Sequence, residues 1–168
     1  PNTYRFSSVN VSVSDILTVM LDQMDELLTP YKEELLSGEL SIHEYVTLAS
    51  MVELEGINDD DKAKIAGVFY NRLERNIPLQ SCATACYATN TSPCVPKEVN
   101  ILFDSPYNTY LASMAGKLPI GPIANFGLTS IQAVIEPEEH DYLFFVSDIN
   151  NQTYFTKTDV EHARKINE

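Results

Sequence analysis

The first third of the chain carries apolar residues at the three- and four-residue spacing of amphipathic helices. Between Ser14 and Leu28 these positions form one stripe, which predicts a helix with Ser14 as its N-cap. The stripe consists of Ile16, Leu17, Met20, Leu21, Met24, Leu27 and Leu28.

Two further helices are predicted from capping patterns. Ser41 and Glu44 stand at capping-box spacing and open a predicted helix that ends at Glu55. Asn58 is predicted to cap a third helix, whose first turn holds the acidic run 59–61. Acidic side chains at that position complement the positive end of the helix dipole.

The second half of the chain has a different pattern. Residues 76–127 hold most of the prolines and all three cysteines, which predicts a long loop-rich segment, and its aromatic side chains favour an ordered one. Apolar and β-branched runs at 142–146 and 153–156 predict a short antiparallel hairpin. Further helices are predicted at 129–135 and 158–166. Helices first and a small sheet later indicate an α+β fold.

The composition is that of an ordinary folded domain. Of 168 residues, 44% are hydrophobic and 21% charged, so we expect a single domain spanning residues 1–168. The formal charge of −13 disfavours nucleic acid and anionic lipid, because nucleic-acid affinity rests on Lys and Arg at the phosphates. No apolar run approaches the ~20 residues of a membrane span. The first residues show neither Met nor a signal pattern, and we expect a domain taken from a longer protein.

Cys82, Cys86 and Cys94 lie within one short stretch. A zinc site is disfavoured because no fourth Cys or His lies nearby. The alternatives are three free thiols, or one local disulfide with a leftover thiol, which an oxidising compartment favours. The histidines are scattered and glycine is scarce, so we expect no metal and no cofactor.

Two carboxylates interrupt the apolar arc of the predicted helix 42–55. Glu53 and Glu55 are two residues apart, so their side chains diverge by ~200° around the helix axis. This excludes a glycosidase pair built from these two acids alone. A carboxylate at an apolar edge has its pKa raised by desolvation, as a general acid requires. The alternative is that both acids are solvated residues at the helix end.

Other polar and aromatic residues have two interpretations each. Arg72 is either a clamp for a phosphate or carboxylate, or a cation at the negative end of its helix. Tyr107 and Tyr110 either stack on sugar or base rings or belong to the core.

Several motifs in collinear order resemble one family. The segments LASMVELE at 48–55, IAGVFYNRL at 65–73 and SPYNTY at 105–110 are similar to motifs of the MltG (YceG-like) endolytic murein transglycosylases. The corresponding family motifs are L-A-S-I-V-E-x-E, V-A-x-V-F-x-N-R-L and S-P-Y-N-T-Y. With Pro1-Asn2-Thr3-Tyr4 at the start, the resemblance covers nearly the whole chain. Further matches lie at 78–87, 118–127, 142–146 and 155–162.

The resemblance implies an activity and a set of site residues. The family cleaves the MurNAc-β-1,4-GlcNAc bond inside peptidoglycan strands and leaves a 1,6-anhydro-MurNAc end. Its catalytic acid is the second Glu of E-x-E, which corresponds to Glu55, acting as a single general acid and base. Glu53 is expected to orient the groove or brace the fold. The other residues implied to line a glycan groove are Asn71, Arg72, Gln80, Thr84, Tyr87, Tyr107, Asn108, Tyr110 and Asn125.

Two departures from the family pattern fall beside the implied acid. Cys82 and Ala83 replace the family's Asp-Pro, and a bridge from Cys82 to Cys86 or to Cys94 would restrain that loop. Gly56 replaces the usual Thr after E-x-E and is expected to free the backbone at this point.

The resemblance also implies a location and partners. We expect one N-terminal membrane anchor, absent from this sequence, with the domain on the extracytoplasmic face of the bacterial cytoplasmic membrane. Peptidoglycan strands and the cell-wall synthesis machinery are the expected partners. The alternatives are a muramidase-type hydrolase, in which water attacks, and a non-catalytic cell-wall binding or scaffold domain.

The acidic charge leads to an expectation about its distribution. Peptidoglycan carries carboxylates on its stem peptides, so a uniformly acidic surface would repel it. We expect the acids on the first helices and at 59–61, and a groove near Glu55 that is neutral or locally basic through Arg72 or Lys117.

Overall fold

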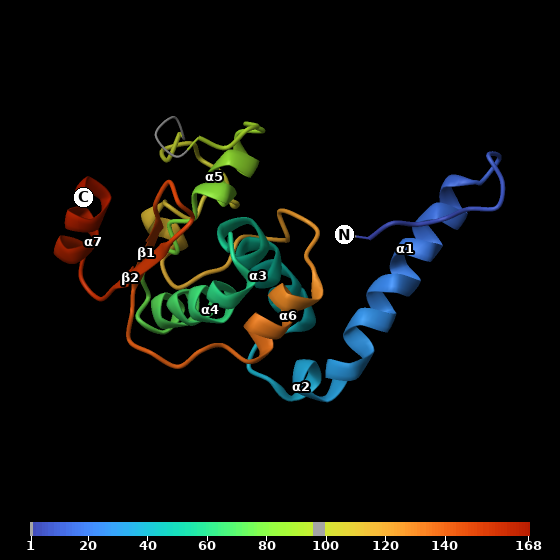
Figure 1. Cartoon of the computed structure of the whole chain (residues 1–168), viewed down its shortest axis with the longest axis horizontal. Helices are drawn as coiled ribbons and strands as arrows, with labels where there is room; N and C mark the ends of the chain where they lie inside the picture. Colours follow the sequence, from blue (N-terminus) through green and yellow to red (C-terminus); the bar gives the residue numbers. More distant parts are fainter. Residues whose placement is uncertain (1, 96–99) are drawn as a thin grey trace.

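The computed structural model describes residues 2–95 and 100–168 and confirms the predicted α+β fold. Three helices pack together at its centre: α3 (Ile42–Glu55), α4 (Asp59–Glu74) and α6 (Leu128–Ile135) (Figure 1). Pro1, which begins one of the sequence matches, and residues 96–99 of the predicted loop-rich segment lie outside the described residues.

The core is centred on α3. From Thr47 to Val52 every side chain of this helix is buried. Burial of each large aliphatic side chain contributes about 1.5–3 kcal/mol, so this packing fixes the rotation of α3 and hence the directions of its last residues. The fully buried side chains of this core include Leu48, Met51 and Val52 of α3 and, from α4 and α6, Ile65, Phe69, Ile131 and Val134.

The first helix, α1 (Val13–Leu28), begins slightly before its predicted start. The predicted N-cap Ser14 is wrong: Ser12 caps the helix, because its hydroxyl accepts from the Asp15 amide while the Asp15 carboxylate accepts from Ser12. The chain then continues through η1 (Thr29–Tyr31) and α2 (Lys32–Ser37).

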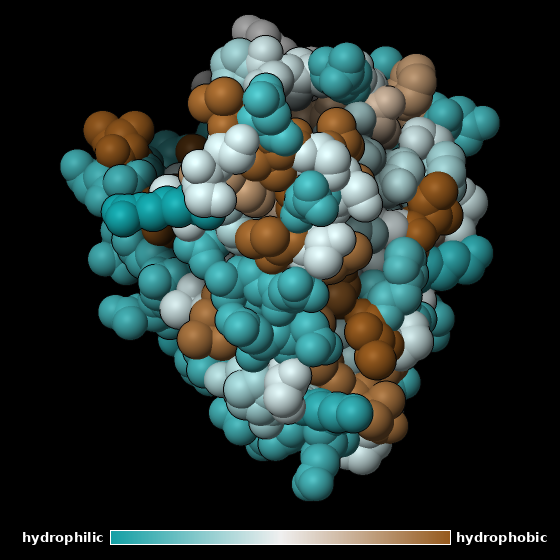
Figure 2. All heavy atoms as spheres, turned by 90° about the vertical axis from the view of Figure 1, so that its right-hand side faces the viewer, coloured by the Kyte–Doolittle hydropathy of each residue, from teal (hydrophilic) through white to brown (hydrophobic). Residues whose placement is uncertain are grey.

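α1 lies along one side of the molecule (Figure 1), and none of its residues is fully buried, although Met24, Leu27 and Leu28 near its end pack against the core. Ile16, Leu17, Met20 and Leu21 are exposed. The face of the molecule on this side shows apolar side chains dispersed among polar ones (Figure 2). Among the described residues, no helix combines the length and apolar character needed to cross a membrane.

The predictions for the second and third helices are largely confirmed. α3 opens with the predicted capping box between Ser41 and Glu44. Asn58 occupies the N-cap position of α4, although its side chain donates to the carbonyl of Asn151 rather than capping the helix. Gly56 ends α3 with a φ of −82°. The backbone at Gly56 is thus not left-handed, and its conformation does not require glycine. The close approach of Lys62 does, because a Cβ at this position would lie 2.6 Å from Cγ of Lys62.

The predicted loop-rich segment holds two short elements, α5 (Cys82–Ala88) and η3 (Ala112–Met114). After α6, β1 (Phe144–Ser147) pairs antiparallel with β2 (Thr153–Thr156), and α7 (Asp159–Asn167) packs against this hairpin. The hairpin prediction is confirmed.

β1 starts two residues later than the predicted strand 142–146. The carbonyls of Tyr142 and Leu143 accept hydrogen bonds from the side chains of Asn71 and Arg72 instead of from a neighbouring strand. Side chains of α4 therefore set the point where the strand begins.

Candidate active site

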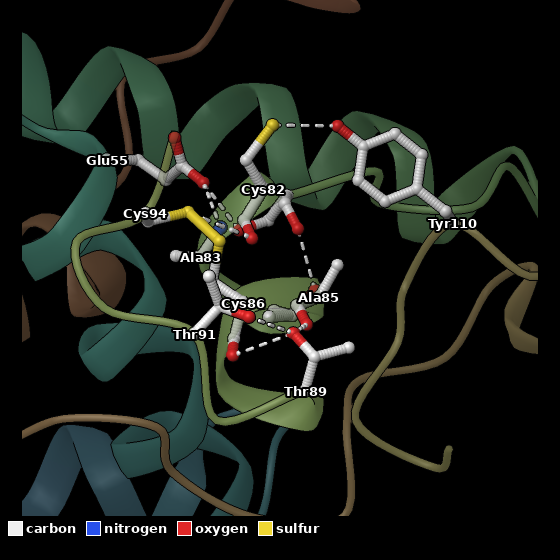
Figure 3. Close-up of a disulfide and its surroundings, with 11 residues drawn as sticks. Glu55, Cys82, Ala83, Ala85, Cys86, Thr89, Thr91, Cys94 and Tyr110 are labelled. Carbon is white, nitrogen blue, oxygen red and sulfur yellow. Dashed lines mark hydrogen bonds between the residues drawn. A yellow bond between two sulfur atoms is a disulfide. The ribbon is translucent and has the colours of Figure 1, made fainter. Parts of the chain in front are cut away.

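Glu55 is the last residue of α3, and its carboxylate meets the start of α5 (Figure 3). Ser81, the N-cap residue of α5, donates from its hydroxyl to Oε1 of Glu55 at 2.5 Å. The backbone N–H of Ala83 also points to Oε1, at 3.4 Å. One carboxylate oxygen is thus held by the protein.

The environment of Glu55 favours its protonated form. The side chain remains partly exposed, yet desolvation by the surrounding protein raises the pKa of its carboxyl. The hydrogen bonds from Ser81 and Ala83 act in the opposite direction but do not cancel the effect of burial. Such a carboxyl can carry a proton at higher pH than a solvated one, as a general acid must.

A thiol and a phenol lie next to this carboxylate (Figure 3). Sγ of Cys82 and Oη of Tyr110 are 3.0 Å apart. Burial raises the pKa of both groups, and the negative charge of Glu55 adds to both shifts. Both groups therefore stay neutral around pH 7, and they form a polar but uncharged neighbourhood for Glu55.

The disulfide joins Cys86 to Cys94, and Cys82 is free. The prediction of one local bridge with one leftover thiol is confirmed, whereas neither of the two pairings considered for Cys82 occurs. Cys82 is the first residue of α5 and its sulfur faces Tyr110, while Cys86 lies on the following turn, next to the returning loop. The bridge ties that loop to α5, whose start binds the Glu55 carboxylate (Figure 3).

Glu53 has a different environment from Glu55. Its Oε2 accepts from the backbone N–H of Gly127 at 3.1 Å, from Nζ of Lys62 at 3.3 Å and from the hydroxyl of Ser130. Burial raises the pKa of Glu53, but these donors together hold it below its ordinary value. Glu53 therefore links α3 to α4 and to the start of α6. As predicted, the two acids do not face one another.

Two predicted site residues on α4 are engaged inside the protein. Nδ2 of Asn71 donates to the carbonyls of His140 and Tyr142 at 2.8 and 3.0 Å. Arg72 is 4% exposed. Its Nε donates to the carbonyl of Leu143, and its Nη1 donates to backbone and side-chain oxygens of residues 78–80. Both residues thus support the loop before α5 and the start of β1.

Two other predicted site residues are fully buried. The hydroxyl of Thr84 donates to the carbonyl of Ser81 at 2.7 Å and shares a hydrogen bond with Thr109 at 2.8 Å. Asn108 donates through its amide to carbonyls of its own loop and accepts from the N–H of Tyr110. These contacts hold the 105–110 loop against α5.

The remaining predicted residues reach the surface. Gln80 is exposed and has a positive φ of 53°. Tyr87, on α5, is 48% exposed, and its ring centroid lies 4.8 Å from that of Tyr107. Asn125 lies elsewhere, in an open pocket of about 280 Å³ formed with the N-terminal segment and α1, and Glu55 is not part of its lining.

Five groups that bind the two acids were not predicted from the sequence: the hydroxyls of Ser81 and Ser130, the amides of Ala83 and Gly127, and Lys62. Ser81 had a signal, since Ser is a preferred N-cap residue, but α5 is short and was not predicted. Lys62 sits among acids in the first turns of α4, a pattern that suggests a solvated face. Among residues 2–95 and 100–168, no group of His, Cys, Asp or Glu could hold a metal ion.

The chain is similar to two endolytic murein transglycosylases. The endolytic murein transglycosylase of Bacillus subtilis is 40% identical over 164 residues, which are 98% of this chain and 45% of the relative. The protein of the same name from Streptococcus pneumoniae serotype 2 is 35% identical over 174 residues, covering 100% of this chain and 31% of that protein. The chain thus spans less than half the length of these relatives.

A solved structure is also similar. The crystal structure of a yceG-like protein from Listeria monocytogenes superposes with a TM-score of 0.91 at 37% identity, and the match covers 98% of this chain and 53% of that one. The sequence pattern of the YceG-like family matches residues 1–168. The chain therefore belongs to the YceG-like family.

Proposed function

We propose that the chain is the catalytic domain of an endolytic peptidoglycan lytic transglycosylase. It cleaves the MurNAc-β-1,4-GlcNAc bond and leaves a 1,6-anhydro-MurNAc end. The observation that carries this proposal is the single carboxyl of Glu55, whose pKa is raised by burial and whose Oε1 is held by Ser81. The names and similarity of the relatives from Bacillus and Streptococcus support it.

One carboxyl suffices for this reaction. Protonated Glu55 donates its proton to the glycosidic oxygen, which leaves as the 4-hydroxyl of GlcNAc. The C6 oxygen of MurNAc attacks C1 of its own ring, and its hydroxyl proton passes to the Glu55 carboxylate, which restores the starting state. General acid–base catalysis of this kind contributes about 10²–10⁴-fold.

The described groups that shift the pKa of Glu55 include no second acid, which favours this route over a two-carboxylate one. Inverting and retaining glycosidases place a second acid roughly 5–9.5 Å from the first. In the described part of the chain, the hydrogen bonds to Glu55 come from Ser81 and Ala83. The nearest acid along α3, Glu53, points to another side of the helix and is held by Lys62.

The exposed residues of the predicted groove are the proposed sugar contacts. Tyr87 lies on α5, one turn from the residues that contact Glu55, and its ring pairs with that of Tyr107. A sugar ring can stack on this pair. Gln80 is exposed next to Ser81. The buried predicted residues, Arg72 among them, act by holding this loop, so we do not propose them as direct contacts. Lys117, the other cation expected near the groove, is exposed, and its Nζ donates to the carbonyl of Ser113.

The proposal extends to the protein from which the domain comes. We propose that the domain works outside the bacterial cytoplasmic membrane, tethered by an anchor elsewhere in a longer chain. Peptidoglycan strands are its substrate, and the cell-wall synthesis machinery is its proposed partner.

Digestion of purified murein sacculi tests the reaction. Wild-type protein is expected to release muropeptides with anhydro-MurNAc ends, detected by mass spectrometry, and Glu55→Gln to reduce their release at least 10²-fold. Glu53→Gln is the matched control, and a soluble, folded sample of it should retain most of the activity. Release of reducing ends instead would favour the hydrolase. Binding to sacculi without any product would favour a scaffold domain.

A further inference from the structure

A second open pocket, of about 490 Å³, lies between the turn after α2, the first half of α3, α4 and the segment that follows α6. Four carboxylates line it: Glu39, Glu74, Glu138 and Glu139. Of these four carboxylates, only Glu138 forms an ion pair within the part of the chain that the structure describes, with Lys64 at 3.3 Å. The pocket therefore carries an excess of negative charge.

A buried phenol also lines this pocket. Tyr45 is 6% exposed, and its hydroxyl makes no hydrogen bond within the part of the chain that the structure describes. The hydroxyl lies against Gly38, where a Cβ would overlap it. Among the described residues, the buried side-chain polar atoms without a partner belong to Thr156 and His162, so the Tyr45 oxygen opens to the pocket and is available to a ligand.

A second phenol, Tyr70, belongs to the same pocket. Its hydroxyl donates to the carbonyl of Val134. Burial raises its pKa, and the nearby Tyr45 and Glu39 raise it further. Tyr70, Tyr45 and the four carboxylates all line this one pocket, so a single bound cation can meet several of them.

We propose that this pocket binds a primary ammonium group carried on an alkyl chain of a peptide, as in a lysine-type side chain. The ammonium is a compact charge with three donors, which suit the unpartnered oxygen of Tyr45 and the carboxylates of Glu74 and Glu139. The alkyl stem packs on the ring of Tyr70. The described residues hold no metal-ligand group here, so the pocket suits an organic cation.

The source of the peptide follows from the proposed function, and this part of the inference rests on it. Tyr45 and Glu55 are ten residues apart on α3, which corresponds to about 15 Å along the axis. Five extended residues span about 16–18 Å, so the length of a stem peptide with a diamino acid matches this axial separation. The pocket would then select strands whose stem peptide carries a free amine.

A binding experiment on the intact chain tests the ammonium site. Nα-acetyl-lysine methylamide is titrated by NMR, with its Nε-acetylated form as the neutral control. We expect binding of the amine alone, at least fivefold weaker with Tyr45→Phe and with Glu139→Gln, and weakened by salt. Both variants keep the shape of the side chain, and circular dichroism confirms that they are folded. Equal binding of both probes, no binding, or binding unchanged in both variants would overturn the site.

A second arm separates this inference from the proposed function. Soluble glycan strands bearing lysine-containing stem peptides are compared before and after Nε-acetylation. The expected result is a KM at least threefold higher for the acetylated strands, and this difference disappears in Tyr45→Phe. Amine binding without any murein cleavage would overturn the proposed function alone. Cleavage with an equal KM for both strands would overturn the role of the pocket in substrate selection.

Discussion

The Ser81 hydroxyl donates a 2.5 Å hydrogen bond to Oε1 of Glu55, joining the start of α5 to the end of α3. Burial of the Glu55 carboxyl favours its neutral form, and this bond favours its charged form. Ser81 and Ala83 both bind Oε1, and the described residues make no hydrogen bond to the second oxygen, which we propose as the proton donor to the substrate. Ser81 is therefore expected to set both the direction and the pKa of the proposed acid.

Replacement of Ser81 by Ala should move the pH profile of the enzyme. The hydrogen bond lowers the pKa of Glu55, so its loss raises that pKa further. Activity that requires protonated Glu55 falls as the pH rises through this value, and the falling limb of kcat/KM against pH should shift to higher pH. The measurement is anhydro-muropeptide release over a pH series.

The control for this variant is Ser81→Thr, which retains a hydroxyl at the N-cap and should keep the wild-type profile. Loss of the Ser81 side chain also removes an N-cap group, although its hydroxyl makes no capping hydrogen bond in α5. A profile of unchanged shape with lower activity at every pH would assign Ser81 to folding alone.

Glu55→Gln should stabilise the fold at neutral pH. The folded-state pKa of Glu55 lies above its ordinary value of 4.5, so the folded protein binds more protons between the two values. The free energy of unfolding therefore decreases as the pH rises through this range. The destabilisation caused by ionised Glu55 is complete above the folded-state pKa. We expect Glu55→Gln to melt higher than wild type at pH 8 and to show no such advantage below pH 4.5. Equal melting temperatures at pH 8 would contradict a buried, desolvated carboxyl.

The Cys86–Cys94 bridge should contribute measurably to stability. It closes a loop with a sequence separation of 8, and the chain-entropy relation gives about 2.5 kcal/mol for a loop of this size. Urea unfolding of Cys94→Ser should show a loss of about that amount. Cys82→Ser leaves the bridge intact and should lose less than about 1 kcal/mol. Alkylation of the unreduced, unfolded protein should modify Cys82 alone, and labelling of another cysteine would disprove the assigned pairing.

Lys62 should matter far more than an exposed lysine in an ion pair. Lys62 has a side chain only 8% exposed and holds both Glu53 and Asp59. Lys62→Met leaves Glu53 partly buried without its cation, which should cost about 2–4 kcal/mol in the free energy of unfolding. The control is Lys157→Met: this lysine and its partner Asp141 are 54% and 59% exposed, and solvent screening leaves such a pair little effect on stability. Similar losses in the two variants would refute the bracing role of Lys62 and Glu53.

The central helices and the hairpin could be predicted because their signals are local. The capping box at Ser41 and the apolar periodicity of α3 depend on neighbouring residues alone, and both were found where predicted. The angular divergence of Glu53 and Glu55 is likewise a property of any helix. What these acids touch was not predictable in this way, because Ser81 and Ser130 reach them from elsewhere in the chain.

The residues implied by family motifs show a second limit of prediction from sequence. A motif marks positions that a family requires, but the motif itself does not separate substrate contact from support. Arg72 and Asn108 are buried and hold loops in place, whereas Tyr87 is exposed. This distinction needs burial and hydrogen-bond partners. The disulfide pairing depended in the same way on the short helix α5, which turns Cys82 toward Tyr110 and leaves Cys86 for Cys94.

Two buried glycines should respond differently to the same substitution. At Gly67, in α4, a Cβ would lie 2.7 Å from Nε2 of His140 and would also overlap the backbone carbonyl of Glu138. The segment that follows α6 must then move away, so Gly67→Ala should cost about 1–3 kcal/mol. At Gly121 the nearest atom to a new Cβ is Oη of Tyr107 at 3.4 Å, and the same change should cost less than about 0.5 kcal/mol. Urea unfolding of the two variants makes the comparison, and equal stabilities would mean that the chain does not pack against Gly67 as closely as described.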